Sequence, residues 1–474
     1  MEFRIEHDYL GDVKVPKDAY WGAQTQRAIE NFPISGIKPI KEYTDAIVLI
    51  KKAAAESNSE IGLLDGKIAS AIVKAADEAL SGKMADQFVV DVYQAGEGTS
   101  NNMNVNEVLA NRAIEILGGK RGDYGVVHPN DHVNMCQSSN DVIPSAIKIA
   151  SIWLSERLIK ALVNLSKALD KKAKEFDDII KSGRTHLMDA APIRLGQEFA
   201  AWRDLIGDSV ERIKISSDKL LEINIGATAV GTGVDADPRY VEKTIEKLAK
   251  FTRLKIRKSN DLPKVTGSSS DLMALSGALR VLAVDLIKIS NDLRLMNSGP
   301  VTALGEIQLP AVQPGSSIMP GKVNPSIIEM VTMVAFSVIG DNDKITLATQ
   351  AAQFELSMME PVIAYNLPHD LIILRNAVEI MTEKAITGIK ANRERMKELV
   401  EKTPGVGLLL NPYIGYEKSA DIVKKAIREN KSVREVVEES GLLDKKTIEK
   451  IFDPYNLTTP RRLDMPDAKK GGKR

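Results

Sequence analysis

The chain has 474 residues, which is enough for two or three domains with a large buried interior. Its 64 lysines and arginines balance its 64 aspartates and glutamates, so no overall charge favours nucleic acid or an acidic membrane surface as a partner. The single cysteine, Cys136, excludes an intrachain disulfide framework and a cysteine-rich zinc site, which suits a reducing compartment.

Residues 1–135 are predicted to form a mixed N-terminal domain. Met1–Lys14 lacks the apolar core of a signal peptide, and no apolar run elsewhere approaches a membrane-spanning length. Helical patterns follow at Lys38–Asn58 and Leu64–Gly82, and irregular stretches rich in asparagine, glycine and serine close the segment. We therefore expect a cytoplasmic protein with no membrane partner.

Long helical patterns with little glycine or proline dominate residues 136–393. In Asp271–Asn297 apolar residues recur at spacings that alternate between three and four, which is a sustained heptad stripe. Val142–Lys181, Pro325–Asp343 and Asp370–Val400 are further candidate helices. Because helices this long need long partners, we predict a mainly α protein with a central helical bundle that also packs against other subunits.

Residues 394–474 are predicted to form a small helical C-terminal domain. Pro404–Pro412 interrupts the bundle pattern, and Tyr416–Pro454 is typical of several short helices. Ala468–Arg474 is expected to be a disordered basic tail.

Four polar, glycine-bearing segments interrupt the helical pattern and are candidates for a functional site. The first, Gly96–Asn104, lets the backbone approach a ligand and places Thr99 at a helix start, although plain helix capping is the alternative. The second, His128–Asp141, ends in a run of donors at the head of a long helix, where an anion is favoured. A metal site at His128 and His132 is disfavoured, because their neighbours are amides and Asp131.

The third segment, Gly183–Ala190, surrounds His186 with threonine, arginine and aspartate, which can fix its tautomer; a capping loop is the alternative. The fourth, Gln313–Pro325, combines paired serines, Lys322 and Asn324 with prolines and glycines that indicate a structured lid. This loop lacks the Walker spacing, so it does not predict a phosphate site.

These motifs resemble the class II fumarases and aspartases, whose signature Gly-Ser-Ser-x-Met-Pro-x-Lys-x-Asn matches residues 315–324 throughout. The resemblance also covers the other three segments and residues 226–233, so it extends over essentially the full chain. It implies a three-domain, mainly α fold and a homotetramer whose core is the long-helix bundle, with active sites built from three subunits each. The implied partner is a small dicarboxylate. No metal, organic cofactor or nucleic acid is implied.

The resemblance also implies roles for individual residues. Ser316 would remove a proton from the carbon beside a carboxylate, and His186, paired with Glu329, would orient or protonate the leaving hydroxyl in a fumarase. Serine is a poor base unless donors stabilise its alkoxide, so closure of the loop should be essential. The residues implied to bind the carboxylates and the departing group are Thr99, Ser138, Ser139, Asn140, Thr185, Ser317, Lys322 and Asn324, and His128, Asn130 and Asp131 are candidates for a second anion site.

The two enzymes of this family differ in whether water or ammonia leaves. The segments that resemble fumarase are Trp21–Arg27, Gln137–Asn140, His186 and Gly305–Ile307, whereas Asp91–Gln94, Met359–Val362, Asn411–Pro412 and Lys431–Val437 resemble aspartase. Because most of the aspartase-like segments lie outside the site, the sequence favours fumarate hydratase of the tricarboxylic acid cycle, with aspartate ammonia-lyase as the alternative. A structural relative without activity is disfavoured, because the implied catalytic residues are all present.

Three departures from the family pattern bear on this choice. Glu97 stands where fumarases usually have serine and aspartases often have alanine, and its carboxylate would favour an ammonium leaving group. Val301 follows Ser-Gly-Pro where the family commonly places arginine. Gly125 and Val126 precede His128 where fumarases often have basic residues of the second anion site.

Overall fold

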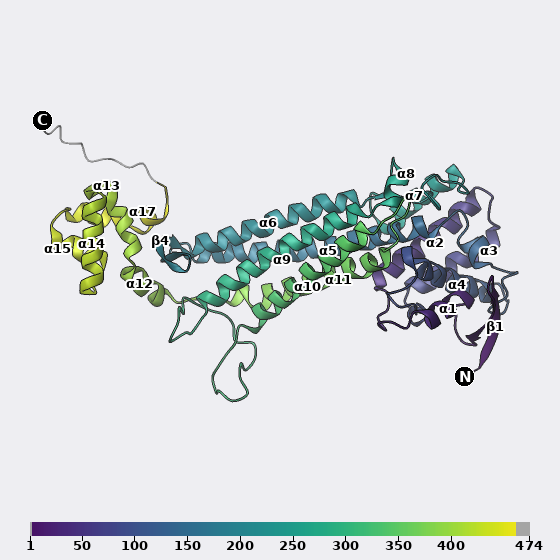
Figure 1. Cartoon of the computed structure of the whole chain (residues 1–474), viewed down its shortest axis with the longest axis horizontal. Coiled ribbons are helices and arrows are strands. Elements are labelled where there is room, and N and C mark those ends of the chain that lie inside the picture. The colour runs from purple at the N-terminus through teal and green to yellow at the C-terminus, as the bar shows by residue number, and fades with distance from the viewer. Residues whose placement is uncertain (1, 461–474) are drawn as a thin grey trace. The chain divides into compact units, whose positions relative to one another are not determined.

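The computed structural model describes residues 2–460, most of which are helical (Figure 1). The chain divides into two compact units. The first unit comprises residues 1–160, 209–284 and 333–376, and the second comprises residues 161–208, 285–332 and 377–474. The boundaries between the units fall inside the long helices, which are α5 (Ser139–Glu175), α6 (Leu195–Lys219), α9 (Ser270–Met296), α10 (Ser326–Gln350) and α11 (Glu360–Lys384).

The first unit begins with a small β-hairpin and continues mainly as helices. Strands β1 (Phe3–Asp8) and β2 (Gly11–Pro16) pair antiparallel. The elements that follow are α1 (Ala23–Asn31), α2 (Lys41–Glu60), α3 (Gly66–Leu80), α4 (Thr99–Ile116), α7 (Pro238–Thr252), α8 (Leu262–Gly267) and the short parallel pair β5 (Glu222–Ile223) and β6 (Arg257–Lys258). Asp65 ends the loop before α3 by accepting hydrogen bonds from the first turn of that helix.

The second unit contains a β-hairpin and a cluster of short C-terminal helices. Strands β3 (Ile180–Thr185) and β4 (Met188–Arg194) pair antiparallel, as do β7 (Ile307–Gln308) and β8 (Lys390–Ala391). The short helices are α12 (Arg393–Lys402), α13 (Asn411–Ile414), α14 (Tyr416–Glu429), α15 (Val433–Ser440), α16 (Lys445–Ile451) and α17 (Pro454–Thr458). Leu410, Val436 and Ile451 are fully buried at the centre of this cluster.

The predicted mainly α fold is confirmed. The heptad stripe of α9 forms part of the buried core. Its stripe residues Leu272, Leu275, Leu279, Leu282, Leu286, Ile289, Leu293 and Met296 are all buried. No helix within residues 2–460 combines the length and apolarity that crossing a membrane requires. The domain boundaries at 135 and 393 stay a prediction, and the predicted basic tail lies outside the described residues.

Three predicted helices were wrong in extent. The helix predicted at Pro325–Asp343 continues to Gln350 as α10. The pattern at Asp370–Val400 is interrupted, because α11 ends at Lys384 and α12 begins only at Arg393. Between the two helices Gly388 packs closely against Pro310, because a Cβ on Gly388 would lie 2.6 Å from the Pro310 side chain. The Asn392 side chain then caps the start of α12. The pattern at 142–181 ends at Glu175, after which the chain enters β3.

Candidate active site

Thr99 stands at the first turn of α4, where two successive left-handed residues redirect the chain. Glu97 has φ 51° and Gly98 has φ 89°, and a Cβ on Gly98 would lie 3.0 Å from Ile143. The Thr99 hydroxyl donates a hydrogen bond to the Glu97 carboxylate and lies 3.0 Å from Ser139 Oγ. The first unit thus brings Thr99, Glu97 and Ser139 together.

Ser139 and Asn140 are the first residues of α5 and Ser138 directly precedes them, so the run lies at the head of this helix, as the sequence predicted. Ser138 Oγ accepts a hydrogen bond from the Asn140 backbone N–H at 3.2 Å. Asp141, which is fully buried, accepts from the backbone N–H groups of Ser138, Gly226 and Thr228 at 3.0–3.1 Å. Burial raises the pKa of Asp141 to about 7. Asp141 therefore joins the 226–233 segment to the serine pair.

A polar network behind the serine pair contains residues that sequence reasoning missed. Asn134 Oδ1 accepts hydrogen bonds from Lys51 Nζ at 2.8 Å, Asn102 Nδ2 at 3.1 Å and Asn106 Nδ2 at 3.2 Å. Asn134 Nδ2 in turn donates to the Gln137 carbonyl at 3.0 Å. Lys51 is fully buried, and burial lowers its pKa to about 7. Its position among the apolar residues of α2 was the available signal.

Glu97 has an unusual electrostatic environment for a surface-loop carboxylate. The side chain is half-buried, and burial raises its pKa to about 7. Its backbone N–H donates to the Met358 carbonyl at 2.7 Å, which fixes the turn. Glu360 is fully buried, and burial, aided by the Glu97 charge, raises its pKa well above the ordinary value. Acidic groups therefore accompany Thr99 in the first unit.

In the second unit, the predicted lid loop is held together at its two ends. The Gly315 N–H donates to the Lys322 carbonyl at 2.8 Å, and Asn324 Nδ2 donates to the Gly315 carbonyl at 2.7 Å. A Cβ on Gly315 would lie 2.6 Å from the Asn324 nitrogen, so only glycine allows this closure without a shift. The loop between these contacts is a defined turn.

That turn surrounds the Ser316 hydroxyl with backbone donors. Ser316 Oγ accepts hydrogen bonds from the N–H groups of Ile318 at 3.2 Å and Met319 at 3.0 Å. Two fixed N–H dipoles stabilise negative charge on the oxygen they face, and this lowers the cost of forming an alkoxide. Ser316 is half-buried and Ser317 is exposed.

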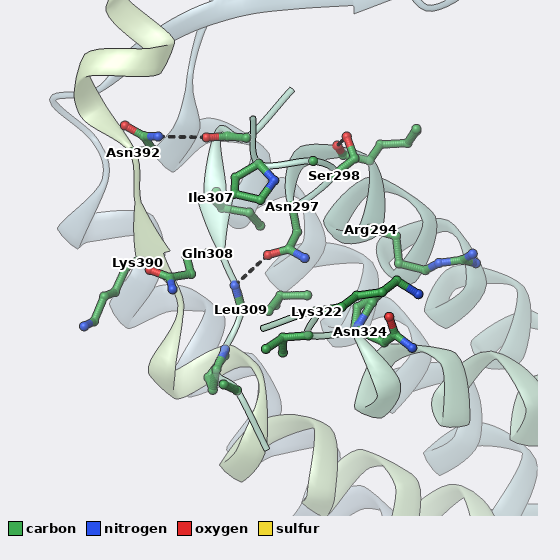
Figure 2. A pocket seen from close by; sticks show the side chains of 18 of the residues that line it. Arg294, Asn297, Ser298, Ile307, Gln308, Leu309, Lys322, Asn324, Lys390 and Asn392 are labelled. Carbon is green, nitrogen blue, oxygen red and sulfur yellow. Dashed lines mark hydrogen bonds between the residues drawn. The ribbon is translucent and has the colours of Figure 1, made fainter. Parts of the chain in front are cut away.

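Lys322, Asn324 and Glu329 line a pocket of about 1210 Å³ in the second unit (Figure 2). In this view Lys322 and Asn324 lie close together, and Asn392 and Lys390 come from the other side. Asn297 Oδ1 accepts from the Leu309 N–H at 2.9 Å, which fixes one edge of the pocket. The charged lining residues are Arg294, Lys322, Lys390 and Glu329, so cations predominate and an anionic ligand is favoured.

His186 lies at the exposed tip of the β3–β4 hairpin, next to Thr185. His186 has φ 56° and Leu187 has φ 61°, so both residues of the two-residue turn are left-handed, a conformation that normally selects asparagine and glycine. Within residues 2–460, His186 and Glu329 form no hydrogen bond to each other, and their pairing stays a prediction.

The base of the same hairpin is fixed by an ion-pair cluster. Arg184 Nη1 lies 2.9 Å from Glu306 Oε1, and Lys181 Nζ lies 3.3 Å from Glu306 Oε2. Glu306 is fully buried. Arg184 therefore anchors the hairpin to the segment before β7 and is a structural residue of the Gly-Arg-Thr-His motif.

His128, Asn130 and Asp131, the candidates for a second anion site, share one turn. His128 Nδ1 accepts from the backbone N–H groups of Asn130 and Asp131, both at 3.2 Å. The His132 Nδ1 accepts from the His128 N–H at 2.9 Å. These contacts make both imidazoles capping groups of residues 129–133.

Family models match most of the chain. The model described as lyase matches residues 11–340, and the model described as fumarase C C-terminus matches residues 409–459. The chain is 47% identical to aspartate ammonia-lyase of Bacillus subtilis (strain 168), over 97% of each chain. It is 46% identical to fumarate hydratase class II of Xylella fastidiosa (strain Temecula1), over 96% of this chain and 95% of the relative.

Solved structures of fumarate lyases and class II fumarases are also similar to this chain. The crystal structure described as fumarate lyase:delta crystallin from Brucella melitensis bound to cobalt has a TM-score of 0.94 at 42% identity, and covers 97% of this chain and 100% of its own. Recombinant class II fumarase from Schistosoma mansoni has a TM-score of 0.93 at 34% identity, with the same coverage. The chain therefore belongs to the class II fumarase/aspartase superfamily of lyases.

Proposed function

We propose that this lyase reversibly removes ammonia from L-aspartate to give fumarate. Ser316 takes the proton from C3 of the substrate, the electron pair of that C–H bond forms the double bond, and the group on C2 leaves. Negative charge develops on the carboxylate beside C3, and Lys322 and Asn324 are the donors we assign to it. The two N–H donors at Ser316 Oγ support this role, because they lower the cost of the alkoxide.

The contact between Glu97 and Thr99 is the observation that carries the choice of ammonia. The substrate's amino group is an ammonium ion, and a neighbouring carboxylate stabilises it, whereas a hydroxyl group gains no charge interaction. Since Thr99 and Ser139 are among the residues that we assign to substrate binding, Glu97 lies beside the departing group. The Bacillus subtilis relative, named aspartate ammonia-lyase, supports the same choice.

Fumarate hydratase is the second candidate, and the sequence alone placed it first. The Ser138-Ser139-Asn140 run at the start of α5 favours it, and the Xylella fastidiosa relative is nearly as similar to this chain. In that reaction Glu97, with its raised pKa, would act as a neutral acid that protonates the leaving hydroxyl.

We also propose a homotetramer in which residues from different subunits complete each site. The first unit exposes apolar side chains on two bundle helices, namely Val281 and Val284 on α9 and Met333, Phe336 and Leu347 on α10. Exposed apolar residues in this number favour a partner surface. Light scattering coupled to size-exclusion chromatography tests the assembly, and a monomer would contradict it.

The reaction is tested by following the ultraviolet absorbance of fumarate with L-aspartate or with L-malate as the only substrate. Fumarate from aspartate alone is the expected result. Fumarate from malate alone would replace the first candidate with the second. Fumarate from neither substrate would contradict both.

A further inference from the structure

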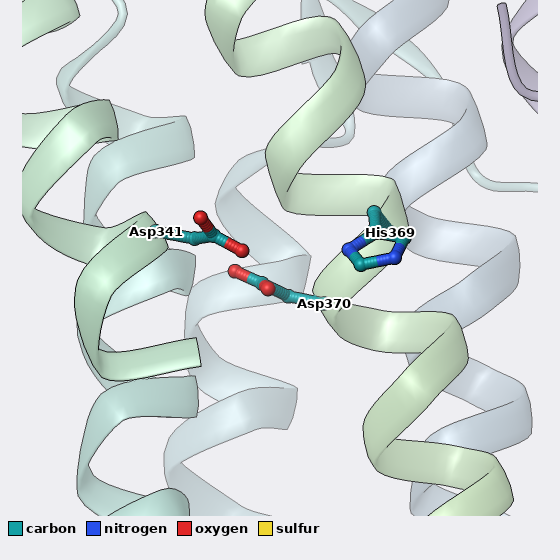
Figure 3. Close-up of side chains that lie close together, drawn as sticks. All are labelled: Asp341, His369 and Asp370. Atoms are coloured by element: carbon teal, nitrogen blue, oxygen red, sulfur yellow. The ribbon is translucent and has the colours of Figure 1, made fainter. Parts of the chain in front are cut away.

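The first unit contains a buried acidic cluster, and none of its residues belongs to the candidate active site. Asp341 on α10 faces Asp370 on α11, and His369 stands beside Asp370 on the same helix (Figure 3). One potential ligand atom from each of the three lies within 4.8 Å of the other two. Asp341 is 5% exposed and Asp370 is 0% exposed, so both carboxylates are removed from water.

Two members of this cluster have unpartnered polar atoms. Within the described part of the chain, neither carboxylate oxygen of Asp370 receives a hydrogen bond, and the buried Nδ1 of His369 has no partner either. Burying a carboxylate without hydrogen-bond donors is costly, so native structures rarely leave one unsatisfied. These atoms point to a positively charged ligand.

The surrounding side chains only partly compensate for the two carboxylates. Lys344 Nζ lies 2.5 Å from Asp341 Oδ1, and Ser337 Oγ donates to Asp341 Oδ2 at 3.4 Å. Both contacts are made to Asp341, so Asp370 gains no direct partner from them. Tyr365 stacks on the His369 ring with centroids 5.3 Å apart, which holds the imidazole in place. Burial and the facing Asp341 carboxylate raise the pKa of Asp370 to about 9, so without a cation the Asp370 carboxyl group holds a proton near pH 7.

We propose that Asp341, His369 and Asp370 bind one divalent transition-metal ion per chain. Two carboxylate oxygens and one imidazole nitrogen form a mixed set that suits Mn²⁺, Fe²⁺ or Zn²⁺, whereas Ca²⁺ and Mg²⁺ prefer oxygen alone. The ion takes the place of the proton on Asp370 and ties α10 to α11. Its role is to stabilise the bundle, and the site is independent of the proposed reaction.

A proton shared between Asp341 and Asp370 would also relieve their repulsion. This state and the metal-bound state exclude each other, because the shared proton occupies the oxygens that the ion requires. Metal binding by the purified chain therefore separates the two descriptions directly.

The test is a titration of the chelator-treated, full-length protein with Mn²⁺, in which the electron paramagnetic resonance signal reports free Mn²⁺. We expect one saturable Mn²⁺ per chain. Asp370→Asn keeps the size of the side chain but removes its charge, and should weaken binding at least tenfold. Asp343→Asn is the matched control on α10: Asp343 is exposed and paired with Arg280, so this variant should bind like the unmodified protein.

Two further measurements keep the test decisive. If Asp370→Asn fails to fold, His369→Gln replaces it, because this variant removes one ligand from a half-buried position. Saturating Mn²⁺ should raise the melting temperature of the unmodified protein by about 2 °C or more, but not that of Asp370→Asn. No bound Mn²⁺, or equal binding by Asp370→Asn and the unmodified protein, would overturn the proposal.

Discussion

The Ser316 hydroxyl oxygen lies 3.0 Å from the backbone nitrogen of Met319, which donates a hydrogen bond to it. If this oxygen is the catalytic base, Ser316→Ala should lower kcat by about 10² to 10⁴. Steady-state rates of fumarate formation measure this, and circular dichroism checks the fold. Ser440→Ala, at the exposed C-terminal end of α15, is the control and should keep full activity. Unchanged turnover in Ser316→Ala would remove Ser316 from the mechanism.

Closure of the loop depends on Gly315. Gly315→Ala places a Cβ 2.6 Å from the Asn324 nitrogen, so the loop ends must separate and the base is displaced. A misplacement of about 1 Å costs about 100-fold in rate, and we expect kcat to fall by about that factor with little change in melting temperature. Gly321→Ala is the contrast, because its Cβ meets nothing within 4 Å and only its φ of 80° is strained. That variant should lose less than about tenfold, which corresponds to about 1.4 kcal/mol.

His186 can be tested without disturbing its turn. His186→Asn removes the imidazole but tolerates the left-handed φ of 56°, so the β3–β4 hairpin should persist. We expect kcat to fall by about 10² to 10⁴ if the imidazole orients or protonates the leaving group. Leu187→Asn changes the neighbouring left-handed residue and should retain activity. Equal losses in both variants would assign the effect to the hairpin.

The pH dependence of activity distinguishes the two leaving groups. Burial raises the pKa of Glu97 to about 7, so its carboxyl group is neutral below this pH and ionised above it. For aspartate, kcat/KM should rise with pH through about 7, because the ionised carboxylate binds the ammonium group. For malate it should fall over the same range, because the neutral acid protonates the hydroxyl.

Glu97→Gln should remove the change in kcat/KM near pH 7 for either substrate. The exposed Glu30→Gln on α1 serves as the control and should leave the profile unchanged. A step that persists in Glu97→Gln would belong to another group and would contradict the assigned role of Glu97.

The ion-pair cluster below the β3–β4 hairpin predicts a large effect on stability. Glu306→Gln removes the charge that faces Arg184 and Lys181, and should lower the free energy of unfolding by about 3–5 kcal/mol. Glu398→Gln removes an exposed carboxylate paired with Arg395 and Lys402, and should lower the free energy of unfolding far less, because water screens exposed ion pairs. Urea denaturation of the two variants measures both values, and equal losses would contradict the buried role of Glu306.

The sequence predicted the helices whose apolar spacing is regular. The pattern at Asp271–Asn297 gave α9 to within one residue, because each stripe position is buried and nothing in it breaks the helix. The sequence did not predict β3, because Ile180–Thr185 lacks a clear alternation of apolar and polar residues. This strand is held in place by β4 and by Glu306. Such strands depend on partners distant in sequence.

The motifs predicted the residues of the candidate site, whose roles stay predictions, whereas the buried charges were not predicted. The lid residues follow from their resemblance to a known loop, and the structure adds the N–H donors at Ser316. Lys51 and Asp370 were not singled out, because a charged residue in a helix is ordinarily solvated and the sequence does not state which face is covered.

Asn134 illustrates how neighbours restrict the residue type at one position. Its oxygen accepts from Lys51, Asn102 and Asn106, while its nitrogen donates to the Gln137 carbonyl. Aspartate would keep the acceptor but set a second oxygen against that carbonyl, and leucine would remove the acceptor that the three donors share. Neither substitute of similar shape meets both demands, so Asn134 should be among the positions of this chain that are least tolerant of mutation.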